Sequence, residues 1–82
     1  MNTTERQLVR ALLNTTRRVP DHATPEDNGT VADVATTVLD QLALAEEPFM
    51  KDYKCYNQAE QAIARLDQYV TRREQENWTL RR

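Results

Sequence analysis

One histidine and one cysteine are the residues of this sequence best suited to catalysis, and they stand far apart. His22 could act as a general base, but Asp21 is the only orienting group beside it and no nucleophile lies nearby in sequence. Cys55 could be a nucleophile or form an intermolecular disulfide, yet it falls on the flank of a predicted apolar helix face, where we expect a small buried hydrophobe. One histidine and one cysteine are too few for a structural zinc site. We therefore expect no enzyme, no bound metal and no cofactor.

Arginine pairs at 17–18, 72–73 and 81–82 are the second feature with binding potential. Arg17, Arg18 or Lys54 could bind nucleic acid or clasp a nucleotide in an oligomer, with aromatic rings that stack on the bases. The net charge of −2 and the lack of a Gly-rich phosphate loop both weigh against this interpretation. Nucleic-acid or nucleotide binding is therefore kept as the alternative function.

Trp78 is the candidate anchor for a partner protein. If its helix stays straight, the 100° step per residue turns Trp78 away from the apolar positions and places it among arginines. Trp, Tyr and Arg are typical of the residues that dominate binding energy at interfaces. We therefore expect Trp78, Arg72, Arg73 and Tyr53 to bind a partner. In the alternative, the helix end frays and Trp78 folds back onto the core.

Size and composition set the framework for these residues. The chain has 82 residues, 29% charged and 39% apolar, with one Gly and three Pro, which predicts one helix-rich domain over residues 1–82. No apolar run approaches the roughly 20 residues that cross a bilayer, and the first residues lack the pattern of a secretory signal. A single cysteine suits a reducing compartment. We expect a cytoplasmic protein with no membrane partner.

Charge is unevenly distributed along the chain. Residues 31–52 are acidic and residues 53–82 are basic. The acidic stretch sets Lys51 against Asp33, Asp40, Glu46, Glu47 and Asp52. Such segregation favours self-association or a charged partner over a uniformly solvated surface.

The first two helices follow from capping signals and apolar spacing. A helix over 3–17 has Asn2 as N-cap and Glu5 positioned for a capping box. A loop over 19–29 holds one helical turn after Thr24 and ends at Asn28-Gly29. A second helix over 31–47 is capped by Thr30, with Asp33 closing the box. Its apolar face comprises Val31, Val34, Ala35, Val38, Leu39 and Leu42.

The third and longest helix is predicted over 49–79. A seven-residue apolar repeat runs along it through Phe49, Tyr56, Ala59, Ile63, Leu66 and Val70. The repeat fails where Arg73 and Asn77 take the next two core positions. The predicted fold class is all-α: an antiparallel hairpin of the second and third helices with a short N-terminal helix. A dimer is expected, because the third helix outruns its two shorter neighbours.

These observations favour an interaction protein. The leading hypothesis is a small helical protein-binding regulator or inhibitor that occupies the surface of another protein. Such a chain would suit a bacteriophage or another mobile element. The partner's identity is not encoded in any motif of the sequence.

Overall fold

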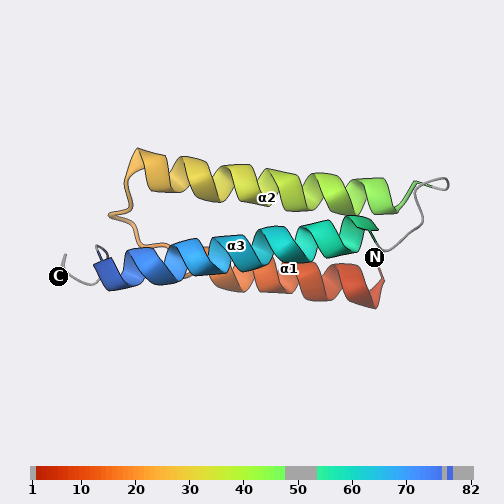
Figure 1. Cartoon of the computed structure of the whole chain (residues 1–82), viewed down its shortest axis with the longest axis horizontal. Coiled ribbons are helices and arrows are strands. Elements are labelled where there is room, and N and C mark those ends of the chain that lie inside the picture. The colour runs from red at the N-terminus through yellow and green to blue at the C-terminus, as the bar shows by residue number, and fades with distance from the viewer. Residues whose placement is uncertain (1, 48–53, 77, 79–82) are drawn as a thin grey trace.

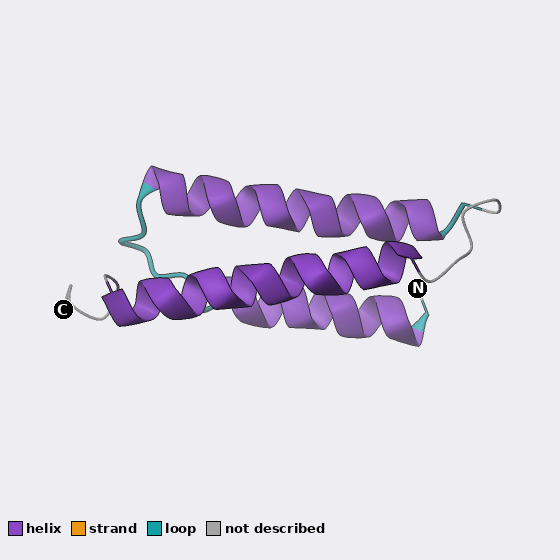
Figure 2. Cartoon of the chain, viewed as in Figure 1, coloured by secondary structure: helices purple, strands orange, loops and turns teal. Residues whose placement is uncertain are grey.

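Three helices make up the described part of the chain in a computed structural model, which covers residues 2–47, 54–76 and 78. They are α1 (Thr3–Thr16), α2 (Pro25–Ala45) and α3 (Lys54–Glu76), with no strand among these residues (Figures 1 and 2). The predicted all-α class is confirmed: α2 and α3 form an antiparallel hairpin, and α1 is the short N-terminal helix. None of the described helices is both long enough and apolar enough to span a bilayer.

Helix α3 is the centre of the arrangement. It packs along both α1 and α2, whereas α1 and α2 touch each other only marginally. Figure 1 shows α3 nearest the viewer, with α2 above it and α1 below and partly behind it; α1 runs parallel to α3 and α2 runs against it. No other described helix packs over the side of α1 and α2 that is turned away from α3.

The start of α1 follows its sequence signal closely. The Asn2 side chain accepts a hydrogen bond from the Glu5 backbone amide at 2.8 Å, which is the expected N-cap. The Glu5 carboxylate does not reach the backbone of Asn2, as a capping box requires. It instead accepts from the Asn2 side-chain amide and from the Tyr56 hydroxyl at 3.1 Å, so the cap also joins α1 to α3.

The start predicted for the second helix is wrong by several residues. Helix α2 begins at Pro25, because Thr24 and Asp27 form a complete capping box with Pro25 in the first turn. Thr30 and Asp33 therefore lie inside the helix and do not cap it. Gly29 lies inside α2 and has no positive φ, so it makes no turn. A Cβ built on it would have no neighbouring atom within 4 Å.

The end of α2 and the bounds of α3 agree less closely with the predicted helix boundaries. Helix α2 ends at Ala45 with Glu46 as C-cap, two residues before the predicted end at Glu47. The predicted start of the third helix at Phe49 and its predicted end at residue 79 lie outside the described residues. Within the described part, α2 has 21 residues and α3 has 23. Within these residues α3 does not far outrun α2, so the premise on which the predicted dimer depended finds no support there.

The core lies along α3 and uses most of the predicted apolar positions. The buried members are Leu8, Leu12, Val38, Leu42, Ala59, Ala62, Ile63, Leu66, Val70 and Trp78. Leu39 was predicted to belong to the buried face of its helix, but it is 53% exposed. Leu13 is 47% exposed on α1. Each of these leucines comes directly after a buried residue, Leu12 or Val38, and so lies one 100° step beyond the buried face of its helix.

Candidate interaction surfaces

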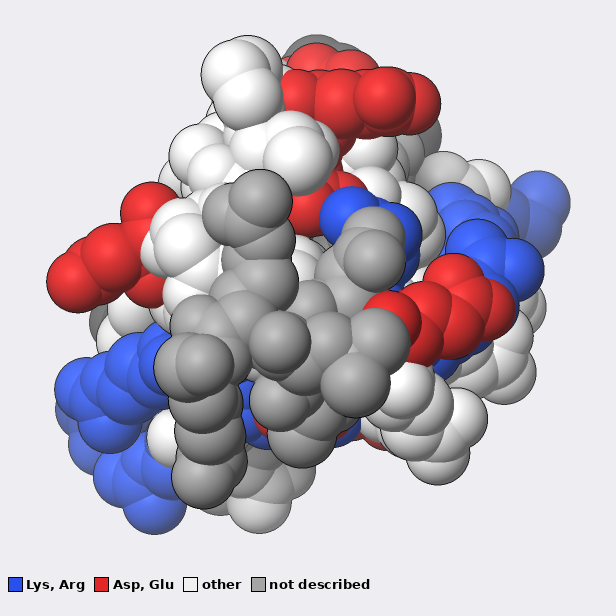
Figure 3. Space-filling model, turned by 90° about the vertical axis from the view of Figure 1, so that its left-hand side faces the viewer, with Lys and Arg blue, Asp and Glu red and all other residues white. Residues whose placement is uncertain are grey.

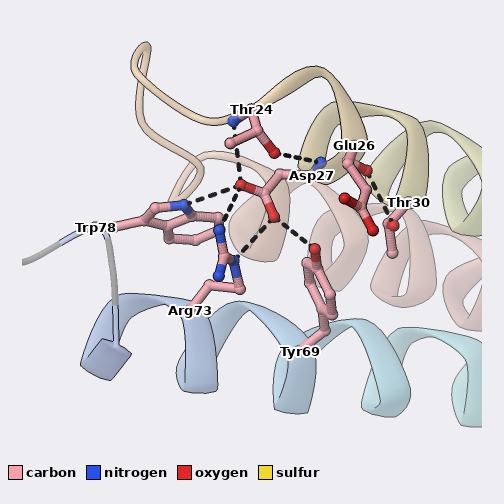
Figure 4. Close-up of polar contacts among 7 residues, drawn as sticks. All are labelled: Thr24, Glu26, Asp27, Thr30, Tyr69, Arg73 and Trp78. Carbon is pink, nitrogen blue, oxygen red and sulfur yellow. Dashed lines mark hydrogen bonds and ion pairs between the residues drawn. The ribbon is translucent and has the colours of Figure 1, made fainter.

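Asp27 is the centre of a buried polar cluster at the end of the molecule where α2 begins and α3 ends (Figure 4). Its carboxylate accepts hydrogen bonds from the Tyr69 hydroxyl at 2.5 Å, from Arg73 Nε at 2.9 Å and Nη2 at 3.1 Å, and from Trp78 Nε1 at 3.4 Å. The Thr24 backbone amide donates a further bond at 3.1 Å. We call these five residues the Asp27 cluster.

Each side chain of the Asp27 cluster is positioned by its helix. Asp27 is the third residue of α2, where a carboxylate is favoured by the positive end of the helix dipole and by the capping box. Tyr69 and Arg73 are four residues apart and so share one face of α3. Arg73 occupies the position at which the apolar repeat of α3 fails, so the core becomes polar there because Asp27 lies opposite.

Electrostatics stabilise the charged form of Asp27. The Arg73 guanidinium holds the pKa of this carboxyl well below its usual range, with help from the Tyr69 hydroxyl and the Thr24 amide and hydroxyl, and these effects outweigh burial. The pKa of Tyr69 is raised because its hydroxyl donates to the Asp27 carboxylate and is partly buried. Asp27 therefore stays a carboxylate and Tyr69 a phenol over a wide pH range. The arrangement joins α2 to α3 and offers no proton donor or acceptor of intermediate pKa.

The cluster changes the interpretation of the residues predicted to bind a partner. Trp78 is 6% exposed and packs on the core, so the folded-back alternative is the one that the structure adopts. Arg73 is paired with Asp27. Arg72 is exposed and lines a surface hollow beside the cluster, and Tyr53 lies outside the described residues. Trp78 thus offers almost no side-chain surface to a partner in this conformation.

The residues predicted to bind nucleic acid or a nucleotide are separated in space. Arg18 forms ion pairs with Asp67 and Glu74 of α3 and donates to the Thr71 hydroxyl at 2.9 Å, so it fastens the end of α1 to α3. Lys54, at the start of α3, is exposed and lies at the other end of that helix. Arg17 is exposed as the C-cap of α1. These three residues do not form one site.

The two chemically reactive residues are also placed. Cys55 is buried with 3% exposure, as expected for a small core residue, and His22 is exposed in the loop before α2. Among the described residues, no group of three or more His, Cys, Asp or Glu side chains lies close enough to hold a metal ion.

A basic and partly apolar strip runs along the solvent side of α1, and no sequence motif pointed to it. Arg6, Arg10 and Arg17 are exposed, and none has an ion pair within residues 2–47, 54–76 and 78. They line a shallow hollow together with Val9, Leu13 and Asn14. The only acidic residue of α1 is Glu5, which is buried. The exposed surface of α1 is therefore positively charged around two apolar side chains.

The apolar part of this strip faces away from α3. Arg18 lies on the flank of α1 that binds α3, as its two ion pairs show. Val9 and Leu13 each lie one 100° step beyond a buried core residue, Leu8 and Leu12, so they stand at the other edge of the core-facing side of α1. They therefore line the side of α1 that is turned toward α2.

Helix α2 presents matching apolar residues. Asp27 faces α3, and the 100° step places Ala35 about 80° and Leu39 about 120° around the helix from it. Val31 and Ala35 are half-buried against the core, and Leu39 is exposed beside them. This flank of α2 is thus turned away from α3 and toward α1.

Register along the bundle brings the two flanks level. Glu5 contacts Tyr56 and Asp27 contacts Arg73, which fixes α1 and α2 along the length of α3. Counting from these contacts at 1.5 Å per residue places Val9 about level with Leu39 and Leu13 about level with Ala35. We call the surface formed by these side chains the open face. It consists of Val9, Leu13, Val31, Ala35 and Leu39.

Charge divides the outer surface around the open face. Helix α2 contains no Lys or Arg, and its outer side carries Asp33 and Asp40, with Glu46 and Glu47 directly after it. Asp40 and Glu47 line a second hollow with Ala43 and Leu44. Figure 3, a view onto the end where α2 begins, shows basic side chains at the lower left and at the right, and acidic side chains at the top, at the left edge and right of centre. The basic strip of α1 and the acidic side of α2 therefore border one apolar surface.

Comparison with known proteins finds no matching family model, no matching curated protein and no matching solved structure.

Proposed function

We propose that this chain is a small helical protein-binding module, a regulator or inhibitor that acts by occupying the surface of a partner protein, and that the open face makes the contact. The observation that supports this proposal is the exposure of Leu13 and Leu39 beside three arginines without ion pairs in the described chain. Apolar side chains rimmed by charged ones are the usual composition of an interaction surface.

Energetics indicate what such a partner must provide. Covering the exposed halves of Leu13 and Leu39 gains about 1 kcal/mol for each leucine. This gain is small beside the cost of association, so additional apolar contacts to Val9, Val31 and Ala35 are required. Arg6, Arg10 and Arg17 add complementarity to an acidic partner and speed the encounter. The open face therefore fits an apolar partner surface with acidic residues at its border.

Capture from a lysate of the source organism tests this proposal when the variants are matched. A partner of the open face is retained by the parent chain and lost on Leu13→Asp, because the new carboxylate is buried without a counter-ion. Leu44→Asp is the control, since Leu44 is 41% exposed on the other side of α2. A partner retained equally by the Leu13→Asp variant would contradict the proposal, provided that circular dichroism shows both variants folded.

Nucleic-acid binding is the second candidate, and the three exposed arginines of α1 are the observation that favours it. Arg6, Arg10 and Arg17 extend over about 16 Å of helix, a length that spans several phosphates of a nucleic acid strand. Affinity for a DNA or RNA oligonucleotide would then fall steeply between low and moderate salt. It would depend on these arginines and remain unchanged on Leu39→Ala, whereas the protein-binding proposal expects Leu39→Ala to weaken binding.

A further inference from the structure

The open face carries opposite charges on its two borders, and a partner that fits it must carry the same two kinds of border in the opposite order. On α1 the exposed charged residues are Arg6 and Arg10, followed by Arg17, and on α2 the exposed charged residues are all acidic. A surface with a basic border and an acidic border, and an apolar strip between them, is complementary to a copy of itself turned by 180°.

Only one of the simple two-fold arrangements matches the charges. An axis along the helices sets α1 of each copy against α2 of the other. An axis across the helices sets α1 against α1 and places arginines opposite arginines, which is repulsive. We infer that a second copy of this chain covers the open face, with the two-fold axis parallel to the helices and α1 of one copy packed against α2 of the other.

The register of the chain supplies specific pairs for this dimer. A rotation about an axis parallel to the helices leaves every residue at its own level along the bundle. Arg10 is about level with Asp40, by the same count that sets Val9 level with Leu39. Arg10 of one copy therefore meets Asp40 of the other at the border, while Leu13 and Leu39 are covered in the middle.

The size of the face sets the strength of the association. Helix α1 has 14 residues and is about 21 Å long, and two helices side by side are about 20 Å wide. Each copy then buries about 400 Å², half of what a standard specific interface buries on each side. The dimer is accordingly weak and concentration-dependent. This inference rests on the proposed function: the open face binds a partner, and a second copy covers it when the partner is absent.

Sedimentation over a range of concentrations is the first test. We expect the parent chain to shift from monomer to dimer as concentration rises, and the shift to weaken at high salt because the border pairs are screened. Leu13→Asp and Leu39→Asp are expected to remain monomeric, whereas the control Leu44→Asp dimerises like the parent. A parent chain that is monomeric throughout, or a dimer unaffected by Leu13→Asp, overturns the inference.

Charge reversal tests the orientation of the two copies. One variant combines Arg6→Glu, Arg10→Glu and Arg17→Glu, and the other combines Asp33→Lys, Asp40→Lys and Glu47→Lys. In the inferred dimer, each variant alone has like charges at both borders and self-associates about tenfold less well than the parent. In the mixed dimer both borders again set opposite charges against each other, so the mixed dimer forms more readily than either homodimer of the variants. No preference for the mixed species contradicts this orientation.

The outcomes separate the inference from the proposed function. A monomeric parent chain that still captures a partner through Leu13 overturns the dimer alone. A dimer without a partner sensitive to Leu13 overturns the proposed function and leaves the dimer established.

Discussion

Asp27 shows how one side chain serves two purposes. It closes the capping box of α2 and accepts hydrogen bonds from Tyr69, Arg73 and Trp78. The sequence predicted one helical turn after Thr24, the break in the apolar repeat at Arg73 and two alternative positions for Trp78. It could not predict that these features meet, because their contact depends on how far α2 extends toward the end of α3.

Stability is expected to depend on the charge of Asp27. Replacing Asp27 with Asn removes the ion pair with Arg73 and lowers the free energy of unfolding by about 1–3 kcal/mol at pH 7. The folded-state pKa of Asp27 is depressed, so its contribution is fully present above the ordinary aspartate pKa and is lost as pH falls below about 4. Denaturant unfolding of both proteins should therefore show a difference at neutral pH that shrinks in acid. A difference that stays constant down to pH 2 would argue against this account.

At the scale of the element, the sequence offered two starts for α2, and local signals alone did not decide between them. Thr24 with Asp27 and Thr30 with Asp33 have the same spacing of a capping box. Asn28-Gly29 is a common turn sequence, which favoured the later start. The earlier start is adopted because it brings Asp27 to Tyr69 and Arg73 and adds helix along α3. Tertiary contacts thus override the modest cost of Gly29 inside a helix.

Gly29→Ala distinguishes a helix from a turn at this point. In α2 the added methyl group meets nothing within 4 Å and the helix gains propensity, so the free energy of unfolding rises by about 0.5–1 kcal/mol. The melting temperature then rises by about 2–8 °C for a domain of this size. A turn with positive φ at Gly29 would give the opposite result, a lower melting temperature. Gly29→Pro serves as the destabilising comparison within the same helix.

The whole molecule is built around α3, which has consequences for the independence of its parts. The sequence predicted three helices and the α2–α3 hairpin from capping and periodicity. It did not predict that Leu39 and Leu13 stay exposed, because a helix pattern shows which residues are apolar but not how wide an angle the neighbouring helices cover. Since α1 and α2 barely touch, α1 is held almost entirely by its contacts with α3.

Helix α1 is therefore expected to open before the α2–α3 hairpin. Its attachment to α3 consists of Leu8 and Leu12 in the core, the Glu5–Tyr56 hydrogen bond and the Arg18 ion pairs. In native-state hydrogen exchange at low protein concentration, the amides of α1 should exchange faster than those in the middle of α2 and α3. Tyr56→Phe removes one hydrogen bond between α1 and α3 and should speed exchange in α1 while leaving α3 protected, because the ring still packs on the core.

If a second copy covers the open face, the amides of α1 become more protected as the protein concentration rises, whereas the Leu13→Asp variant shows no such dependence. Equal exchange in all three helices at every concentration would mean that the chain opens as one unit, and that α1 is held by more than the contacts with α3.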